Sequence, residues 1–166
     1  MNSAWLPPLV LEKNYPDITA YAEALYSFFK TDFLDSLPVW PEKRVGLKRE
    51  PLRRGKEATF WHFLTDGEDE EARQLDFLRC ERIRWPRPVM EAFTNQKPTT
   101  TDRVVWWKNQ RKLDVNFVLA PPDFSYLFVV RDMKEYVLPW TQYVLIQEHQ
   151  RRKNRDEYEA YWATRS

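Results

Sequence analysis

Cysteine and histidine are scarce in this chain of 166 residues, which has one cysteine, Cys80, and two histidines, His62 and His149. A single thiol cannot build a disulfide framework, and so few Cys and His side chains argue against a cysteine-rich zinc site or a structural metal centre. We expect Cys80 to be a structural thiol. No metal and no other cofactor is expected.

Glycine and long apolar runs are also lacking. The three glycines, Gly46, Gly55 and Gly67, lie far apart, so the chain has no glycine-rich phosphate loop. No apolar run approaches the roughly 18 residues that a membrane span needs. The N-terminal segment 1–8 has neither a basic nor an apolar region of the kind found in secretory signals. We therefore expect a protein of the reducing cytoplasm with no membrane partner.

Charge is nearly balanced, with 26 Lys and Arg against 25 Asp and Glu, a formal net charge of +1. This balance argues against a strongly basic nucleic-acid clamp but leaves open how the charge is distributed. Residues 43–56 hold seven basic side chains and one acidic side chain, and their glycines and proline predict a short strand and loops. Aromatic residues reach 16%, which indicates an aromatic core or a surface that stacks bases or packs against a partner.

The order of periodic segments predicts an α+β fold in one domain over residues 1–166. Asp17 caps an apolar stripe of helical period, which predicts an N-terminal helix over about 17–36. A sheet-containing core follows over about 45–146, and a charged C-terminal helix over about 148–162. We expect an antiparallel sheet, a C-terminal three-stranded meander plus an earlier strand, with N-terminal, middle and C-terminal helices packed on it.

The earlier strand is assigned to residues 57–65, whose β-branched and aromatic content favours a strand buried on both faces. Residues 113–119 alternate between apolar and polar side chains, as in a half-buried antiparallel strand. Residues 109–112 are assigned to the hairpin before it. Pro139 in the last strand predicts an edge position or a bulge.

Metal-independent cleavage of RNA needs a base that takes the proton of a ribose 2′-hydroxyl and an acid that protonates the departing 5′-oxygen. It also needs cations that stabilise the phosphorane. His62 is our candidate for the base or the acid, because burial among aromatic rings would shift its pKa and fix its tautomer. The alternative is a core histidine with satisfied hydrogen bonds. His149 is expected to be a solvated residue of the last helix.

Four arginines lie close together in segment 79–88, with Glu81 as the one acidic residue among them. Arginine matches phosphate in a bidentate manner, so Arg82 and Arg84 are candidates for holding the substrate phosphate. The alternative is compensation of a helix dipole together with surface ion pairs.

Basic and aromatic side chains also alternate around the hairpin of the meander, where Lys108, Arg111 and Trp106 are candidates for substrate binding. In the last strand Thr141 and Tyr143 are two residues apart, so both hydroxyl groups project from one face and could meet one substrate. The alternative for this pair is ordinary strand packing.

Three stretches carry a family resemblance: residues 55–62, residues 79–88, and the Thr141-x-Tyr143 strand that leads into a basic, tyrosine-containing helix. Together they resemble the superfamily of metal-independent ribonucleases and toxins that includes barnase, EndoU, the nuclease colicins and RelE, in its phage and prokaryotic branches. The resemblance implies that His62 is a catalytic histidine and that Thr141 and Tyr143 lie near the substrate. No second histidine matches a second acid–base group, so Glu81, Tyr143 or an arginine would have to serve.

The sequence hypothesis is therefore a toxin-like, metal-independent endoribonuclease that acts on RNA, with a protein antitoxin or inhibitor implied by the resemblance. With His62 as its acid–base group, this hypothesis places His62, Arg84 and Tyr143 in one concave surface. The first alternative is an inactive RNA- or protein-binding domain of the same fold. The second alternative is an interaction protein of a phage or mobile element, whose aromatic surface buries a partner.

Overall fold

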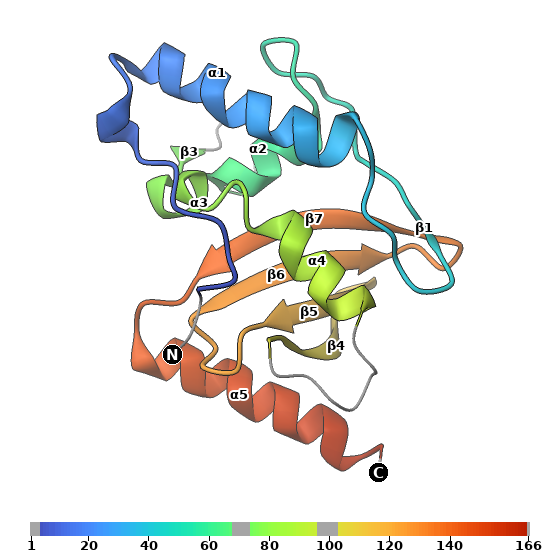
Figure 1. Ribbon diagram of the computed structural model, residues 1–166. Helices are drawn as coiled ribbons and strands as arrows, with labels where there is room; N and C mark the ends of the chain where they lie inside the picture. Colours follow the sequence, from blue (N-terminus) through green and yellow to red (C-terminus); the bar gives the residue numbers. More distant parts are fainter. Residues whose placement is uncertain (1–3, 68–73, 96–102, 166) are drawn as a thin grey trace.

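A mixed sheet forms the centre of the computed structural model, which describes residues 4–67, 74–95 and 103–165 (Figure 1). The elements along the described chain are η1 (Glu12–Asn14), α1 (Ile18–Phe29), η2 (Lys30–Leu34), β1 (Arg44–Val45), α2 (Ala58–Leu64), β2 (Thr65–Asp66), β3 (Gln74–Leu75), α3 (Phe77–Glu81), α4 (Pro86–Thr94), β4 (Val105–Arg111), β5 (Asp114–Ala120), β6 (Tyr126–Asp132), β7 (Tyr136–Val144) and α5 (Glu148–Ala163).

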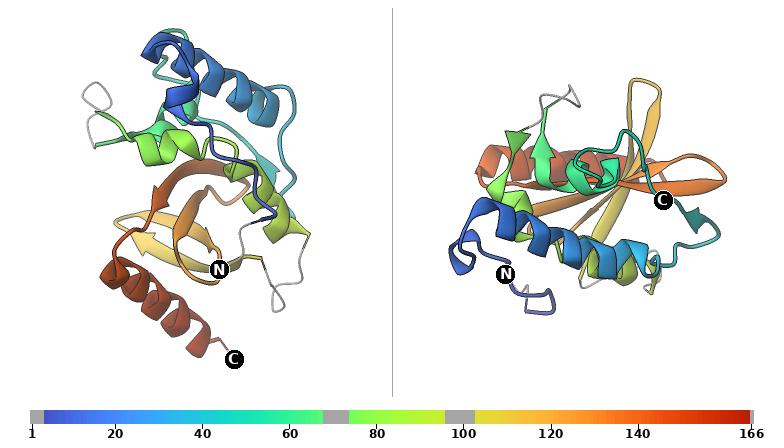
Figure 2. Two further views of the ribbon diagram at one scale, coloured as in Figure 1. Left: turned by 60° about the vertical axis from the view of Figure 1, so that its left-hand side comes forward. Right: turned by 90° about the horizontal axis from the view of Figure 1, so that it is seen from above.

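The large sheet has the strand order β1-β7-β6-β5-β4. Strands β4 to β7 form an antiparallel meander, and the short β1 pairs in parallel with β7. Helices α1, α2 and α3 gather near β7, whereas α5 lies at the opposite side near β4 (Figures 1 and 2). The predicted α+β class, an antiparallel sheet with packed helices, is confirmed. The meander has four strands where three were expected.

The prediction of a strand over 57–65 is wrong. These residues form helix α2, and every one of its seven side chains is buried. A short run that is apolar on all sides suits a fully buried helix as well as a fully buried strand, and β-branched content does not separate the two. Thr59 fixes the start of α2, because its hydroxyl accepts a hydrogen bond from the Lys48 amide at 2.8 Å and donates one to the Lys48 carbonyl.

Both terminal helices are confirmed. Asp17 caps α1 by accepting a hydrogen bond from the amide of Ala20 at 2.8 Å, and a π-helical turn, η2, extends the helix to Leu34. Helix α5 has no buried residue, although its aromatic side chains rest on the sheet. The indole of Trp162 donates a hydrogen bond to the carbonyl of Trp106 at 2.6 Å.

Two groups of buried apolar side chains hold the layers together. The larger lies between the sheet and helices α1 to α4 and includes Phe29, Phe60, Phe63 and Phe128. Their rings pack 5.4 to 5.8 Å apart, which supports the aromatic-core interpretation of the composition. The smaller group surrounds Trp107 under α5. The two faces of the sheet are thus covered unequally, because α5 is the one helix among the described residues that covers the second face.

One buried amide ties β7 to the helices above it. The side-chain NH2 of Gln142 donates hydrogen bonds to the carbonyls of Phe63 in α2 and Arg79 in α3, at 3.0 and 2.8 Å. Its oxygen accepts a hydrogen bond from the hydroxyl of Tyr126 at 2.6 Å. Gln142 is fully buried, so these three partners replace all of its contact with water.

We expect Gln142→Leu to lower the free energy of unfolding by about 2–4 kcal/mol, because it removes three buried hydrogen bonds, of which only the one at the Arg79 carbonyl leaves a group with another partner, the Arg82 amide. Urea denaturation measures this loss. Tyr126→Phe removes one of the three hydrogen bonds and should cost about 1 kcal/mol. A Gln142→Leu variant as stable as the wild type would show that the amide does not anchor the helices.

Candidate functional site

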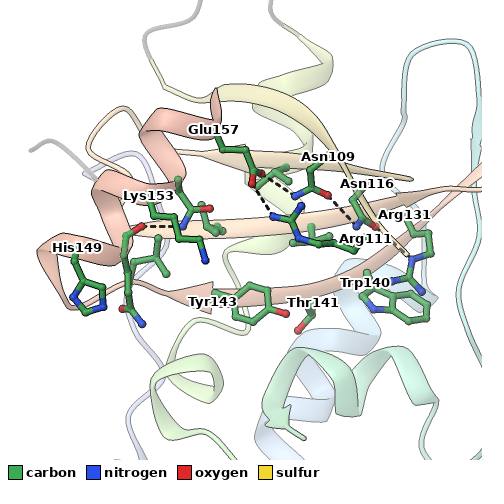
Figure 3. A pocket seen from close by; sticks show the side chains of 16 residues that line it. Asn109, Arg111, Asn116, Arg131, Trp140, Thr141, Tyr143, His149, Lys153 and Glu157 are labelled. Atoms are coloured by element: carbon green, nitrogen blue, oxygen red, sulfur yellow. Dashed lines mark hydrogen bonds and ion pairs between the residues drawn. The ribbon is translucent and has the colours of Figure 1, made fainter. Parts of the chain in front are cut away.

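A pocket of about 590 Å³ opens between the second face of the sheet and α5 (Figure 3). Alternate residues of the strands point to it because side chains in a strand alternate between the two faces. Its lining combines apolar side chains of the sheet with polar and basic side chains. The polar and charged residues of the lining include Asn109, Arg111, Asn116, Arg131, Thr141, Tyr143, His149, Lys153 and Glu157. We call this cavity the sheet pocket.

Strand β7 supplies Thr141 and Tyr143 to the sheet pocket, so the prediction that they share a face is confirmed. The Thr141 hydroxyl donates a hydrogen bond to the carbonyl of His62 at 2.8 Å, which leaves its oxygen able to accept a bond from a ligand. Tyr143 is 39% exposed. The guanidinium of the buried Arg79 lies 4.7 Å from the centroid of the Tyr143 ring and holds it in place.

A bulge directs Trp140 toward the same face. Val130 pairs with Pro139 and Val129 pairs with Thr141, so Trp140 is the additional residue on β7. The bulge at Pro139 was one of the two outcomes predicted from the sequence. The guanidinium of Arg131 stacks on Trp140 at 3.7 Å from the ring centroid. Burial lowers the pKa of Arg131, while Asp114 acts in the opposite sense, so a partly desolvated cation lies in the pocket wall.

On β4 and α5 the pocket is closed by a network centred on Glu157. Its carboxylate accepts hydrogen bonds from Trp107, Asn109 and Arg111 at 2.7, 3.1 and 2.7 Å. Asn116 continues the network by donating to the side chain of Asn109 at 3.2 Å. Burial alone would raise the pKa of Glu157, but the three donors outweigh it and hold that pKa below its ordinary value.

Helix α5 supplies His149 and Lys153 from its first two turns. Both side chains are exposed, as expected for His149, and both line the sheet pocket. Figure 3 shows the rings of His149 and Tyr143 along the same margin of the pocket, with Lys153 above them. An imidazole and a phenol thus share a pocket with Arg111, Arg131 and Lys153.

The structure does not place His62 in this pocket. His62 is 4% exposed, and its ring packs edge-on against Trp140, with 5.0 Å between ring centroids. His62 belongs to α2 instead of a strand, and that helix packs against α1, α3 and β7. The expectation that His62, Arg84 and Tyr143 share one concave surface is therefore wrong, because Tyr143 alone of the three lines the sheet pocket.

The arginine-rich segment 79–88 supports the fold instead of the pocket. Arg82 pairs with Glu81 at 3.6 Å and stacks on Trp85, and Arg84 lies 4.9 Å from the ring centroid of Phe28. None of Glu81, Arg82 and Arg84 lines the sheet pocket. Their contacts match the alternative of local ion pairs and packing on neighbouring rings.

The candidates near the hairpin of the meander divide between the two faces of β4. Arg111 belongs to the strand, not to the hairpin connection, and therefore points to the sheet pocket together with Asn109. Lys108 lies on the other face, where it pairs with Asp132 at 3.5 Å. Trp106 also lies there and packs against Phe93 of α4. Neither Lys108 nor Trp106 lines the pocket.

Cys80 is fully buried, as expected for a structural thiol, and burial raises its pKa to about 12. Within residues 4–67, 74–95 and 103–165, no three Cys, His, Asp or Glu side chains lie close enough to hold a metal ion. No helix in the described part of the chain is long and apolar enough to cross a membrane.

The polar or charged residues of the sheet pocket that the sequence analysis missed as site residues include Asn109, Asn116, Arg131, His149, Lys153 and Glu157. The alternation in β5 indicated that Asn116 faces away from the apolar core. In the sheet, Asn116 of β5 pairs with Arg131 of β6 on one side and with Asn109 of β4 on the other, so the three side chains lie on the same face. Lys153 follows His149 by four residues, one helical turn, so the spacing alone placed both on one side of α5.

A scan against protein-family models and searches of curated proteins and of solved structures found no significant match to this chain.

We expect Glu157→Gln to destabilise the protein by about 1 kcal/mol at neutral pH, because the ion pair with Arg111 is lost. A lowered pKa in the folded state stabilises the protein fully above the unfolded value of about 4.5. This stabilisation disappears as the pH falls through the folded pKa. Urea denaturation of both proteins between neutral pH and pH 3 should show the difference shrinking below about 4.5.

Glu159→Gln is the matched control, since it removes an exposed carboxylate from the same helix. A Glu157→Gln difference that stays constant down to acid pH would contradict the network.

Proposed function

We propose that the protein is a metal-independent endoribonuclease whose active site is the sheet pocket. The proposal depends on one observation: an imidazole, a phenol and three cationic side chains line one open pocket. Acid–base cleavage of RNA uses these kinds of group. The resemblance to the barnase, EndoU, colicin and RelE superfamily supports the proposal through Thr141 and Tyr143, whereas its other residues, His62 and segment 79–88, lie outside the sheet pocket.

The proposed step is an attack within the RNA strand. His149 accepts the proton of a ribose 2′-hydroxyl, and the 2′-oxygen forms a bond to the adjacent phosphorus. The bond from phosphorus to the 5′-oxygen of the next nucleotide breaks, and Tyr143 donates its proton to that oxygen. The products are a 2′,3′-cyclic phosphate and a 5′-hydroxyl, and the proton taken by His149 returns to Tyr143 through water.

The cations on the rim neutralise the charge that develops on the phosphorane. Arg111 and Arg131 present guanidinium groups from β4 and β6, and Lys153 adds an ammonium group from α5. The Thr141 oxygen accepts a hydrogen bond from the nucleotide, because its own proton is engaged by the His62 carbonyl. His62 is then a positioning residue that acts through its backbone.

A second candidate function is RNA binding without cleavage. The burial of the His62 ring favours it, because the sequence hypothesis assigned the acid–base step to that ring. In this case the sheet pocket would hold phosphate and stack bases, and the presence of His149 and Tyr143 in one pocket would carry no chemistry.

Incubation of the purified protein with single-stranded RNA in EDTA tests the proposal. We expect 2′,3′-cyclic phosphate and 5′-hydroxyl ends from the wild type. His149→Gln and Tyr143→Phe should each lower kcat by about a hundredfold or more, with RNA affinity retained. Tyr143→Phe keeps the ring on Arg79, so a loss of kcat reports on the hydroxyl.

His62→Gln is the matched control for the imidazole. It should lower the melting temperature while the remaining folded protein keeps its kcat. Intact RNA at high protein concentration would overturn the nuclease and leave the binding function, provided that the RNA is bound. Loss of kcat in His62→Gln with His149→Gln unaffected would return the acid–base role to His62.

A further inference from the structure

A smaller cavity, of about 270 Å³, lies between α1, α2 and the turn at residues 53–56, on the side of the sheet opposite to α5 (Figure 1). We call it the arginine pocket, because Arg53 and Arg54 line it. Among the described residues, none that lines the arginine pocket also lines the sheet pocket. The proposed active site therefore does not account for this cavity.

The inner wall of the arginine pocket is apolar. Leu25 of α1 and Leu64 of α2 are buried there, whereas Ile18 and Leu75, which also line the pocket, are exposed. The cavity is smaller than the roughly 300–1,000 Å³ of a pocket for a drug-sized ligand. It therefore suits a single small apolar group.

Cations outnumber carboxylates in the lining of this pocket. Arg53, Arg54 and Lys56 line it against one carboxylate among the described residues, that of Glu23. Glu23 pairs with Lys56 at 2.8 Å. The two arginines are thus left without a carboxylate in the pocket wall.

A tight turn and an indole ring hold Arg53 at the pocket wall. Arg53 and Lys56 exchange two backbone hydrogen bonds of 3.0 Å. Arg54 and Gly55 between them have positive φ values of 54° and 75°, as in a type I′ turn. The indole of Trp61 donates a hydrogen bond to the Arg53 carbonyl at 2.9 Å, and the Arg53 guanidinium lies 4.9 Å from the Trp61 ring centroid.

One nitrogen of this guanidinium lacks an acceptor. Nη1 of Arg53 is buried and has no hydrogen-bond partner among the described residues. A buried donor without an acceptor is unfavourable, and the guanidinium fork matches the oxygens of carboxylates and phosphates. An anion that pairs with Arg53 would supply the kind of acceptor that the pocket wall does not.

We propose that the arginine pocket binds a small amphipathic anion, an apolar body with a carboxylate or phosphate head. The apolar body contacts Leu25 and Leu64, and the head pairs with Arg53. The exposed Arg54 adds a second positive charge beside the head. Glu23 does not compete for Arg53, because it is engaged by Lys56. The proposal is independent of RNA cleavage in the sheet pocket.

Isothermal titration calorimetry of the full chain with octanoate, octyl phosphate and octanol tests the proposal. Octanol has the same apolar body without a charge, and acetate has the carboxylate without the body. We expect the better of the two octyl anions to bind at least about tenfold more tightly than octanol, because the alcohol forms no charge-assisted hydrogen bond with arginine. Acetate should show no measurable binding. The tighter anion identifies the head as carboxylate or phosphate.

Arg53→Gln should weaken binding of that anion by about tenfold or more and leave octanol binding unchanged. Arg152→Gln is the matched control, since it removes an exposed arginine of α5 that does not line the pocket. If Arg53→Gln lowers the melting temperature too far for calorimetry, Arg54→Gln replaces it, with a severalfold loss of affinity expected. Equal affinity in the pocket variant and in Arg152→Gln would overturn the proposal.

A second pair of variants tests the cavity itself. Ala22→Leu places a larger apolar side chain in the lining of the pocket, whereas Ala24→Leu makes the same change on α1 outside it. We expect Ala22→Leu alone to abolish binding of the octyl anion. Equal binding by the two variants would contradict the proposal, as would octanol bound as tightly as the anions. Failure of both octyl anions to bind the wild type at millimolar concentration would also overturn it.

Discussion

The positions of the helices depend on polar contacts that β7 makes with the backbone of its neighbours. Gln142 binds carbonyls of α2 and α3, and Thr141 binds the carbonyl of His62 in α2. Thr141 and Gln142 are successive residues of β7 and point to opposite faces of the strand, yet both donate hydrogen bonds to carbonyls of α2. These hydrogen bonds are directional and buried, so they restrict the position of α2 more tightly than apolar contacts do.

This anchoring explains why the second face of the sheet is open. The aromatic residues of α1 and α2 pack on one side, so the polar residues of β4 to β7 are left to the other side, where α5 covers part of the surface. Glu157 fixes α5 through side chains of β4. The sheet pocket is the space that remains between the Glu157 network and β7, and cationic side chains lie on both sides of the pocket.

The sequence was informative where one signal decided the structure. Asp17 marked the start of α1, and the spacing of Thr141 and Tyr143 placed both hydroxyl groups on one face. It was misleading at 57–65, because a buried helix and a buried strand have the same apolar composition. The roles given to Arg82 and Arg84 failed for a related reason: the density of charge does not show which rings and carboxylates lie nearby. The pocket combines side chains from five elements, and only strand register and the placement of α5 bring them together.

The bulge at Trp140 makes the number of residues in β7 as important as their identity. Before it, Leu138 lies on the same face as Arg131, and after it Thr141 lies on that face, although the two positions are an odd number apart. If the strand lost the bulge but kept all its residues, strict alternation would turn one half of it over, so either Gln142 would leave the interior or Leu138 would enter it. Deletion of Trp140 would instead leave Leu138 and Thr141 two residues apart, and both halves of β7 would keep their faces.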